Sequence, residues 1–280
     1  MISKLSPAKV NLYLRVLGKR ADGFHDISTL MQRISLYDEM IFSPAGHGIT
    51  LSCPGGSIPE DYNNIVYRAA DALLSPLSHS PGIHITIKKK IPVAAGLGGG
   101  SSNAATALVI INDMMNLRYN TDDLMKMGAK LGADVPFFIF GRTAWASGIG
   151  NRLRNAENIP PLWFVLINPG FEISTKMVYE GLNLRLTKRA VSYKCPKLYS
   201  VDDIVKGLHN DLERVSLAIH PILRYFKSLL VQSGALGAMM SGSGPTVMGI
   251  FTDEEGAINA EKALENAGGN GWSIYRARSI

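Results

Sequence analysis

A glycine-rich loop placed directly before a helix-forming segment constrains this chain more than any other feature. Four of the five residues from Gly96 to Gly100 are glycine, and Ser101 and Ser102 lead into helix formers from Ala104 to Leu117. Glycine permits positive φ and close approach of a ligand. The following helix begins with unpaired N–H groups and the positive end of its dipole. The combination predicts an anion site, most suited to the phosphates of a nucleotide.

The loop differs from two common nucleotide-binding motifs. A Walker A loop ends in Gly-Lys-Ser or Gly-Lys-Thr, whereas these glycines lead straight into serine. The dinucleotide fingerprint belongs to a regular βαβ unit, and the spacing of Gly96, Gly98 and Gly99 fits it poorly. A plain turn before a helix is the simpler alternative. Ser101 and Ser102 can cap the helix, contact phosphate, or reach Mg²⁺ carried by the nucleotide.

Composition narrows the class of protein. The chain has 280 residues, 46% hydrophobic and 19% charged, so it is long enough to bury a large core without disulfides or metals. Its two cysteines, Cys53 and Cys195, form neither a disulfide framework nor a zinc cluster. The first residues lack a signal-peptide pattern, and the apolar stretches are too short to span a bilayer. We therefore expect a soluble cytoplasmic protein without a membrane partner.

The formal net charge of +6 suggests polyanionic partners. The basic residues are dispersed instead of forming a tail or a stripe, which argues against nucleic acid. The densest run, Lys88-Lys89-Lys90, stands immediately before the glycine-rich loop. A solvated face of ordinary lysines explains such a run as well. We expect small phosphorylated molecules as partners, and no nucleic acid.

Hydrophobic periodicity predicts a mixture of strands and helices. Val10, Leu12, Leu14 and Val16 alternate with polar residues, so a strand is expected there, with Lys9, Asn11 and Tyr13 on one face. A second alternating strand, residues 83–88, leads to the glycine-rich loop. Thr121-Asp122-Asp123 is expected to cap a helix that runs to about Leu131. Pro136 is expected to keep Val135 out of helical geometry, which would leave Asp134 in an extended turn.

The second half of the chain continues the mixture, which predicts an α+β fold. Strands are expected at residues 162–168, 235–240, 246–251 and 272–278, and helices at residues 174–182, 201–208, 219–232 and 254–267. Pro160-Pro161 marks a boundary or the end of a hairpin. We predict an N-terminal domain, residues 1–155, that carries the loop, and a C-terminal domain, residues 156–280.

Three further residues and one further segment are candidates for chemistry. Phosphoryl transfer to an alcohol needs a carboxylate for the hydroxyl proton and a cation for the developing charge. Asp134 and Lys9 are the candidates, although a turn aspartate and a surface lysine are simpler interpretations. His25 can bind a base or merely complete a turn. The glycine turn Met239–Thr246 is either a hairpin or a second wall of the active site, with N–H groups aimed at phosphate.

Three segments together resemble the GHMP kinase family, named for galactokinase, homoserine kinase, mevalonate kinase and phosphomevalonate kinase. The segments that carry the resemblance are Pro7–Leu12, Gly96–Ser102 and Ser241–Thr246. The resemblance covers nearly the whole chain. It implies an N-terminal domain similar to ribosomal protein S5 domain 2 and a ferredoxin-like C-terminal domain.

Further segments sharpen the resemblance within the family: Lys19–His25, Gly132–Phe138 and Asn210–Glu213. They resemble kinases that act on a cytidine diphosphate-linked substrate. The resemblance implies that ATP phosphorylates the 2-hydroxyl of cytidine diphosphate-linked methylerythritol, a step of non-mevalonate isoprenoid synthesis. Another alcohol within the same family is the nearest alternative acceptor.

The same resemblance assigns roles on the acceptor side. Asp134 is implied as the base and Lys9 as its charged partner. Asn11 and His25 are implied to bind the substrate, with His25 reading the cytosine. Phe24 and Tyr179 are implied to sandwich that ring. Many family members have tyrosine at the position of Phe24, so a hydroxyl-mediated contact is expected to be missing here.

On the nucleotide side, the resemblance implies that ATP is held by Asn64 and by the loop. The loop residues are Pro92, Val93, Ala94, Ala95, Gly96, Leu97, Gly98, Gly99, Gly100, Ser101 and Ser102. We expect Mg²⁺ with the nucleotide, and the residues that bind it are not identified by the sequence. We also expect a monomer or a weak homodimer.

Overall fold

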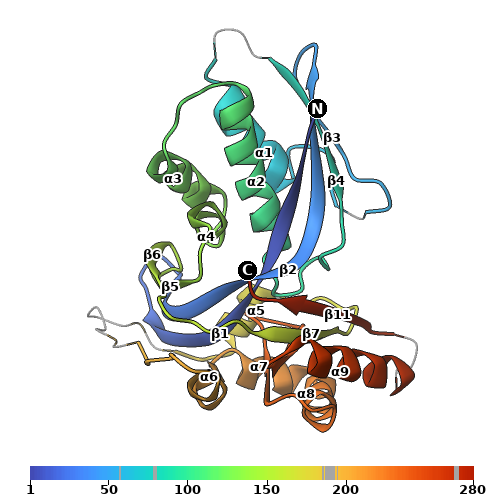
Figure 1. The fold of residues 1–280 in the computed structure, drawn as a ribbon. Coiled ribbons are helices and arrows are strands. Elements are labelled where there is room, and N and C mark those ends of the chain that lie inside the picture. The colour runs from blue at the N-terminus through green and yellow to red at the C-terminus, as the bar shows by residue number, and fades with distance from the viewer. Residues whose placement is uncertain (57, 78–80, 185, 187–192, 194, 268–270) are drawn as a thin grey trace. The chain divides into compact units, whose positions relative to one another are not determined.

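The fold of the chain consists of helices and strands mixed along its whole length (Figure 1). A computed structural model describes residues 1–56, 58–77, 81–184, 186, 193, 195–267 and 271–280. The chain divides into two compact units. The first comprises Met1–Ala8, Tyr37–Ile91 and Gly98–Gly141, and the second Lys9–Leu36, Pro92–Leu97 and Arg142–Ile280. Both mix helices and strands, which confirms the predicted α+β class.

Two long strands contribute residues to both units: β1 (Ile2–Lys19) and β2 (His25–Ala45). The predicted strand around Val10–Val16 is therefore confirmed, and it is part of a longer element than the alternation indicated. The predicted division into residues 1–155 and 156–280 is another partition of the chain, and it stays a prediction.

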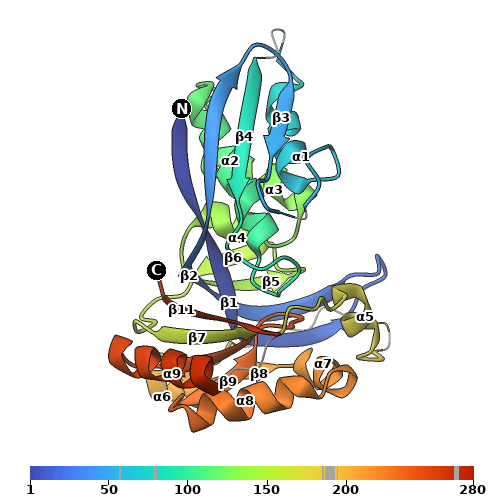
Figure 2. The same cartoon turned by 90° about the vertical axis from the view of Figure 1, so that its right-hand side faces the viewer.

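In the first unit, helices cover one face of a small sheet, as Figures 1 and 2 show. Strand β4 (Gly82–Lys88) pairs antiparallel with β2, from Glu39 opposite Lys88 to Ala45 opposite Gly82, and parallel with β3 (Ile49–Ser52). The helices are α1 (Ile65–Leu74), α2 (Gly99–Met114), α3 (Thr121–Leu131) and α4 (Val135–Phe140).

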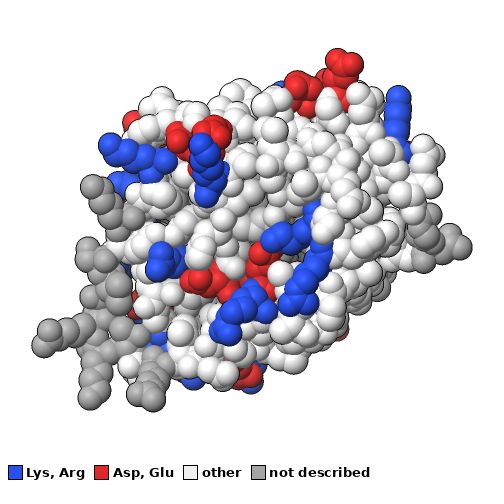
Figure 3. Space-filling model, turned by 90° about the horizontal axis from the view of Figure 1, so that it is seen from below, with Lys and Arg blue, Asp and Glu red and all other residues white. Residues whose placement is uncertain are grey.

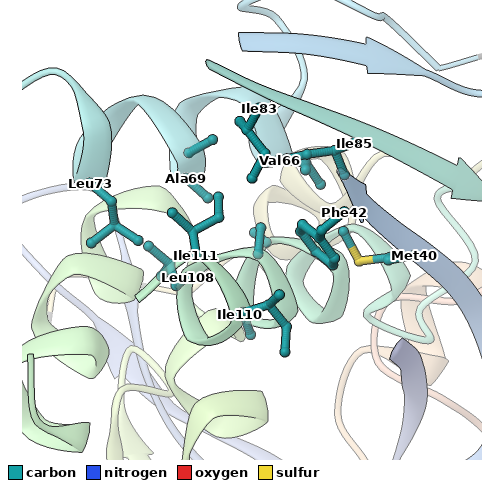
Figure 4. Packing of buried hydrophobic residues seen from close by; sticks show 14 of the residues in the cluster. Met40, Phe42, Val66, Ala69, Leu73, Ile83, Ile85, Leu108, Ile110 and Ile111 are labelled. Carbon is teal, nitrogen blue, oxygen red and sulfur yellow. The ribbon is translucent and has the colours of Figure 1, made fainter. Parts of the chain in front are cut away.

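The core of this unit follows from two periodicities in the sequence (Figure 4). Alternate residues of β4, including Ile83 and Ile85, point to one face of the sheet. Leu108 and Ile111 of α2 recur at helical spacing and meet them, together with Phe42 of β2. All five side chains are completely buried. This packing holds α2, and with it the end of the glycine-rich loop, against the sheet.

The structure corrects the interpretation of Pro136. Helix α3 ends at Leu131 as predicted, but its N-cap is Asn120. Val135 is helical, since α4 begins there with Pro136 in its first turn and Asp134 at the N-cap. Proline is tolerated in a first turn because no intrahelical bond needs its missing N–H. The expectation of an extended turn at Asp134 is therefore wrong: the residue has φ −87° and ψ −10° and opens a helix.

The second unit contains two groups of paired strands. β2 pairs with β5 (Ala144–Gly148), β5 with β6 (Arg152–Asn155), and β1 in parallel with β8 (His209–Asn210). The other sheet has the order β11-β7-β10-β9. Its strands are β7 (Trp163–Asn168), β9 (Gly237–Met240), β10 (Val247–Phe251) and β11 (Ser273–Arg278). These four strands confirm the strands predicted after residue 160.

Helices cover this four-stranded sheet from one side (Figure 2). The helices of the unit are α5 (Thr175–Glu180), α6 (Val201–Gly207), α7 (Glu213–Ile219), α8 (Ile222–Gln232) and α9 (Glu254–Ala267). Leu223, Phe226 and Leu230 of α8 are buried at helical spacing and pack into the core. The sequence predicted all of these helices except α7.

The charges of the second unit are interspersed on the face seen in Figure 3, where acidic side chains lie beside basic ones. Ion pairs of this unit join Lys227 to Glu213 at 2.8 Å and Arg276 to Glu261 at 2.9 Å. This mixed face agrees with the dispersed charge of the sequence. Among the described residues, no helix is long and apolar enough to cross a membrane.

Removal of the Phe42 ring should test the core of the first unit. The side chain is completely buried, so Phe42→Ala is expected to lower the free energy of unfolding by about 3–5 kcal/mol through lost burial and a cavity. Urea denaturation followed by circular dichroism measures this. The control Leu5→Ala changes a side chain that is 60% exposed and should cost no more than about 0.5 kcal/mol.

Candidate active site

Lys9 and Asn11 form a buried polar pair on β1. Their exposed fractions are 4% and 3%, and Lys9 Nζ donates to Asn11 Oδ1 at 2.6 Å. Asn11 Nδ2 in turn donates to Thr29 Oγ1 at 2.8 Å. The prediction that Lys9 and Asn11 share one face of a strand is confirmed. The simpler interpretation of Lys9 as a surface lysine is wrong, because its ammonium group is held inside the unit.

The three segments that carry the family resemblance meet in the second unit. The N–H of Lys9 donates to the carbonyl of Leu97 at 2.9 Å. The N–H of Asn11 donates to Ser241 Oγ at 3.3 Å, and that hydroxyl donates to the carbonyl of Gly96 at 3.0 Å. The first strand, the first half of the glycine-rich loop and the Ser241–Thr246 turn are therefore fastened to one another by hydrogen bonds.

Gly96 is required where the loop meets this turn. It has φ +75°, and a Cβ atom at this position would overlap the carbonyl oxygen of Ser241. Gly242 is similarly close to the polar pair: a Cβ there would lie 3.5 Å from Lys9 Nζ and 3.4 Å from Asn11 Oδ1. The absence of side chains lets two backbone segments and the Lys9 ammonium occupy one small volume.

The second half of the loop begins helix α2 in the first unit. Gly98, the N-cap, has φ +70° and supplies no side-chain hydrogen bond to the helix. The N–H groups of the first turn thus remain for another acceptor, at the positive end of a 16-residue helix. Gly100 is exposed beside them. This arrangement has the chemistry of a phosphate site.

The two serines after the glycines have different surroundings. Ser102 is completely buried and accepts a hydrogen bond from Ser6 Oγ at 2.8 Å. Ser101 is half-buried. A Cβ on Gly132 would lie 3.7 Å from Ser101 Oγ, which places this hydroxyl near the segment that precedes Asp134. Neither serine is the N-cap of α2, so one of the three alternatives for them is excluded.

A buried polar network supports the loop, and sequence reasoning missed it. Asp38 is completely buried and accepts hydrogen bonds from the N–H groups of Lys90 and Ile91, at 2.8 and 2.9 Å. It is also paired with Lys89 Nζ and accepts from Asn103 Nδ2 at 3.0 Å. The network joins the segment before the loop to the first turns of α2. The lysine run before the loop was the available signal, but only the fold shows that Lys89 is the one that turns toward Asp38.

The structure places Asp134 and Asn64 at helix starts in the first unit. Asp134 is half-buried at the N-cap of α4. Asn64 caps α1: its Oδ1 accepts from the N–H of Val66 at 2.9 Å, and its Nδ2 donates to the carbonyl of Pro59 at 2.6 Å. Both ends of the Asn64 side chain therefore serve the local fold. Its contact with ATP stays a prediction.

His25 and Tyr179 come together in the second unit. Their rings stack with centroids 4.9 Å apart and an angle of 30° between planes. The loop before His25 is held by Arg20, which binds Asp22 and Asp26. Phe24 is 57% exposed. Of the predicted aromatic sandwich, the structure thus brings Tyr179 to His25, and it leaves Phe24 at the surface.

The charge state of His25 is shifted by its surroundings. Burial lowers the pKa of the imidazole below its usual value, and the positive charge of Lys19 lowers it further. The ring is therefore neutral at physiological pH. A neutral imidazole offers one donor and one acceptor, which suits recognition of the edge of a base.

A groove of about 1000 Å³ lies in the second unit beside the start of β2. Its lining includes Asp26 and Ser28 of β2, Trp145 of β5, and Arg152. Asp26 directly follows His25 in the chain. The lining does not include His25, Phe24 or Tyr179, nor Lys9 or Asn11, so the residues predicted to bind the substrate do not form this groove.

Two family descriptions match the chain. "GHMP kinases N terminal domain" matches residues 64–142, and "GHMP kinases C terminal" matches residues 196–270. The chain is 55% identical, over 100% of both chains, to 4-diphosphocytidyl-2-C-methyl-D-erythritol kinase from Syntrophus aciditrophicus (strain SB). It is 47% identical to the protein of that name from Syntrophotalea carbinolica, over 100% of this chain and 99% of the relative.

Solved structures agree with these similarities. A crystal structure of 4-(cytidine 5'-diphospho)-2C-methyl-D-erythritol kinase matches with a TM-score of 0.83 and 32% identity, over 99% of each chain. Homoserine kinase from Cytophaga hutchinsonii matches with a TM-score of 0.70 and 19% identity, over 100% of this chain and 94% of the other. The second match concerns the fold alone.

Glycine substitutions should separate the two halves of the loop. Gly96→Ala is expected to lower the free energy of unfolding by at least about 2 kcal/mol, because it adds left-handed strain and a steric overlap. At Gly100 a Cβ would meet only Ile65 Cγ2, at 3.8 Å. Gly100→Ala should therefore keep its stability and weaken ATP binding, because the methyl group covers the exposed first turn.

Urea denaturation and calorimetric titration with ATP measure the two effects. Gly96→Ala with wild-type stability would contradict the role of the close contact at Ser241. Unchanged ATP affinity in Gly100→Ala would contradict the phosphate site.

Proposed function

The chain belongs to the GHMP kinase family, among its 4-diphosphocytidyl-2-C-methyl-D-erythritol kinases, and from this premise we infer how its residues carry out the reaction. It transfers the γ-phosphoryl group of ATP to the 2-hydroxyl of 4-(cytidine 5'-diphospho)-2-C-methyl-D-erythritol, in the synthesis of isoprenoid precursors. The observation that carries the geometric argument is the buried Lys9–Asn11 pair, to which the glycine-rich loop and the Ser241–Thr246 turn are fastened.

ATP is the co-substrate, and we propose that its phosphates lie on the glycine-rich loop. The uncapped first turn of α2 after Gly98 fits this group, because its N–H groups and helix dipole favour an anion. The exposed position of Gly100 fits it too, since the backbone is accessible there. The loop lacks the lysine of a Walker A motif, so positive charge has to come from elsewhere in the chain.

We propose that Mg²⁺ accompanies the nucleotide. Within the part of the chain that the structure describes, no group of three or more His, Cys, Asp or Glu side chains gathers to hold a metal ion. This fits Mg²⁺, which is commonly bound by substrate phosphates, water and one or two carboxylates. We propose the Ser101 hydroxyl, at the start of α2, as the side chain that reaches the ion. The ion would neutralise phosphate charge.

The proposed chemistry assigns the proton to Asp134. The carboxylate of Asp134 takes the proton of the 2-hydroxyl, and the oxygen forms a bond to the γ-phosphorus while the bond to the β-phosphate oxygen breaks. ADP leaves with the electron pair of that bond. Lys9 stabilises the negative charge that develops during transfer. Its hydrogen bond to Asn11 supports this role, because it fixes the direction of the ammonium group.

We propose that the cytosine is recognised by His25, between the rings of Phe24 and Tyr179. The stacking of His25 on Tyr179 supports this arrangement, since it orders both side chains. In this structure His25 covers one face of Tyr179, so we propose that the base enters on that side and that the imidazole turns its edge toward it. Stacking tolerates any base, and the neutral imidazole therefore has to supply selectivity by hydrogen bonding. Phe24 provides a ring face without a hydroxyl.

We further propose that the protein works in the cytoplasm, where ATP is available, as a monomer or a weak homodimer. Sedimentation equilibrium at micromolar concentration would measure this state. A stable higher oligomer would contradict it.

ADP release with two acceptors tests the proposed function. The cytidine diphosphate-linked substrate should support turnover, and the same sugar phosphate without cytidine should support far less, because it lacks the group that His25 recognises. Equal turnover of both acceptors would contradict recognition of the base. Absence of ADP release with either would contradict the reaction itself.

Replacement of Asp134 tests the proposed base. Asp134→Asn keeps the shape of the side chain but cannot take a proton at neutral pH. We expect kcat to fall about 10²- to 10⁴-fold, the usual contribution of a general base, while the Kd of ATP changes little. Steady-state ADP release and calorimetry measure the two quantities. An Asp134→Asn enzyme with full turnover would refute the assignment.

His25→Ala tests recognition of the base and its pH dependence. We expect KM for the cytidylyl substrate to rise about 10-fold or more, as for a lost buried hydrogen bond, and KM for ATP to stay the same. In the wild-type enzyme the pKa of His25 is lowered from its usual value of 6.5, so the imidazole is neutral at any pH above 6.5. KM for the cytidylyl substrate should therefore be constant from pH 7 to 8 and rise only in more acidic solution, where the imidazole is protonated.

The lowered pKa of His25 also affects the stability of the fold, which decreases in acidic solution. Below pH 6.5 the unfolded chain binds a proton that the folded imidazole resists, so this residue destabilises the fold as pH falls. Equal loss of both ligands in His25→Ala would contradict its placement at the base.

A further inference from the structure

The segment from Asn210 to Glu213 belongs to the sequence resemblance, yet the proposed reaction gives it no role. Asn210 ends β8 and lies opposite Leu14 of β1. Its side chain is buried, with 8% of the residue exposed. Glu213 begins α7 and is only partly exposed. A buried amide and a nearby carboxylate need partners, and these partners identify what the segment does.

Asn210 holds two carbonyl groups of the Met240–Gly242 segment. Its Nδ2 donates to the carbonyl of Met240 and to the carbonyl of Gly242, both at 2.8 Å. Its Oδ1 accepts from the N–H of Leu212 at 3.0 Å, which fixes the orientation of the amide. Both N–H donors of the side chain are thereby used on the glycine turn. No other standard side chain of this size offers two donors and one acceptor.

Glu213 holds the same segment through the backbone N–H of Met240. Its Oε1 accepts from the N–H of Met240 at 2.9 Å, and its Oε2 is paired with Lys227 Nζ at 2.8 Å. Ser216 adds a third contact, since its hydroxyl donates to the carbonyl of Ser243 at 3.1 Å. The start of the turn is thus bound to side chains of β8 and α7, beyond its strand pairing with β10.

These contacts determine where the N–H groups of the turn point. In a trans peptide the C=O and the following N–H are antiparallel. Asn210 binds the carbonyl of Gly242, so the N–H of Ser243 points away from Asn210. Among the hydrogen bonds between described residues, this N–H has no acceptor. The turn itself lies against Lys9 and Asn11, through Ser241 Oγ and the bare Cα of Gly242.

We propose that Asn210 and Glu213 are positioning residues, which orient the Ser241–Gly244 turn so that the N–H of Ser243 donates to a phosphate oxygen during transfer. The proposal rests on the proposed function, because the phosphate is that of the kinase reaction. Asn210 and Glu213 act through the backbone and touch no reactant. Their loss should therefore lower kcat more than it raises either KM.

Asn210→Asp provides a test with its own pH signature. The carboxylate keeps the acceptor for Leu212 but loses both donors and faces two carbonyl oxygens. We expect kcat at pH 8 to fall about 30-fold or more, with KM values within about threefold. Burial beside carbonyl groups raises the pKa of an aspartate, so protonation restores one donor. The ratio of mutant to wild-type kcat should rise between pH 8 and pH 6.

A kcat ratio that does not change with pH, or a loss of kcat that merely equals the unfolded fraction, would overturn the role of Asn210.

A matched pair of variants tests Glu213 in case Asn210→Asp does not fold. Glu213→Ala and Lys227→Met both remove the ion pair, but only Glu213→Ala removes the acceptor of the Met240 N–H. We expect kcat to fall about 10-fold in Glu213→Ala and less than twofold in Lys227→Met. Equal losses of kcat in the two variants would mean that Glu213 acts only through its ion pair with Lys227, and would refute the positioning role.

The backbone amide of Ser243 gives a readout that does not need turnover. In ¹⁵N-labelled wild-type protein, its resonance should shift on addition of Mg²⁺ and a non-hydrolysable ATP analogue together with the cytidylyl substrate. The shift should be smaller in Glu213→Ala than in the wild-type protein. In Lys227→Met it should be as large as in the wild-type protein. No shift in the wild-type protein would overturn the proposal. If that shift appears but no ADP is released in the assay, the proposed function fails while the positioning role stands.

Discussion

The hydroxyl of Ser241 is the contact on which the arrangement of the second unit's site depends. It is completely buried, accepts from the N–H of Asn11 and donates to the carbonyl of Gly96. One side chain thus joins the first strand, the glycine-rich loop and the Ser241–Thr246 turn. The join requires bare backbone at Gly96, because a Cβ there would overlap the Ser241 carbonyl. Glycine at this position therefore serves packing between segments as well as access for a ligand.

In each unit, buried polar groups fix the positions of the candidate site residues more than the apolar core does. In the first unit, Asp38 joins Lys89 and Asn103 beneath the start of α2. In the second unit, Lys9 is held by Asn11, and Asn210 holds the turn at Gly242. A buried polar or charged group without partners is costly. Each network is consequently satisfied in only a few geometries, which is how side chains far apart in the sequence acquire definite positions.

Local sequence patterns predicted that most helices and strands exist, but they predicted less well where each one begins and ends. Alternation and helical spacing predicted β4, α8 and most other elements, because each element buries one face. Pro136 misled because the same residue that ends one helix can open the next. The strand β2 was missed as a long element, and its pairing with β4 and β5 is a long-range property. The aromatic partner of Tyr179 in this structure, His25, likewise follows from packing and not from spacing.

The sequence alone determined the family, the α+β class, and the shared strand face of Lys9 and Asn11, and it predicted an anion site at the glycine-rich loop. The family follows from the resemblance of its motifs, and the fold class and the shared strand face follow from periodicity, which acts over a few neighbouring positions. Only the tertiary structure decided that Lys9 is buried, that Ser241 binds both Asn11 and Gly96, and that Asn210 binds the carbonyls of Met240 and Gly242. The reason is that burial and hydrogen-bond partners depend on segments that lie far apart in the sequence, such as Asn11 and Ser241. No local pattern records which of these segments meet.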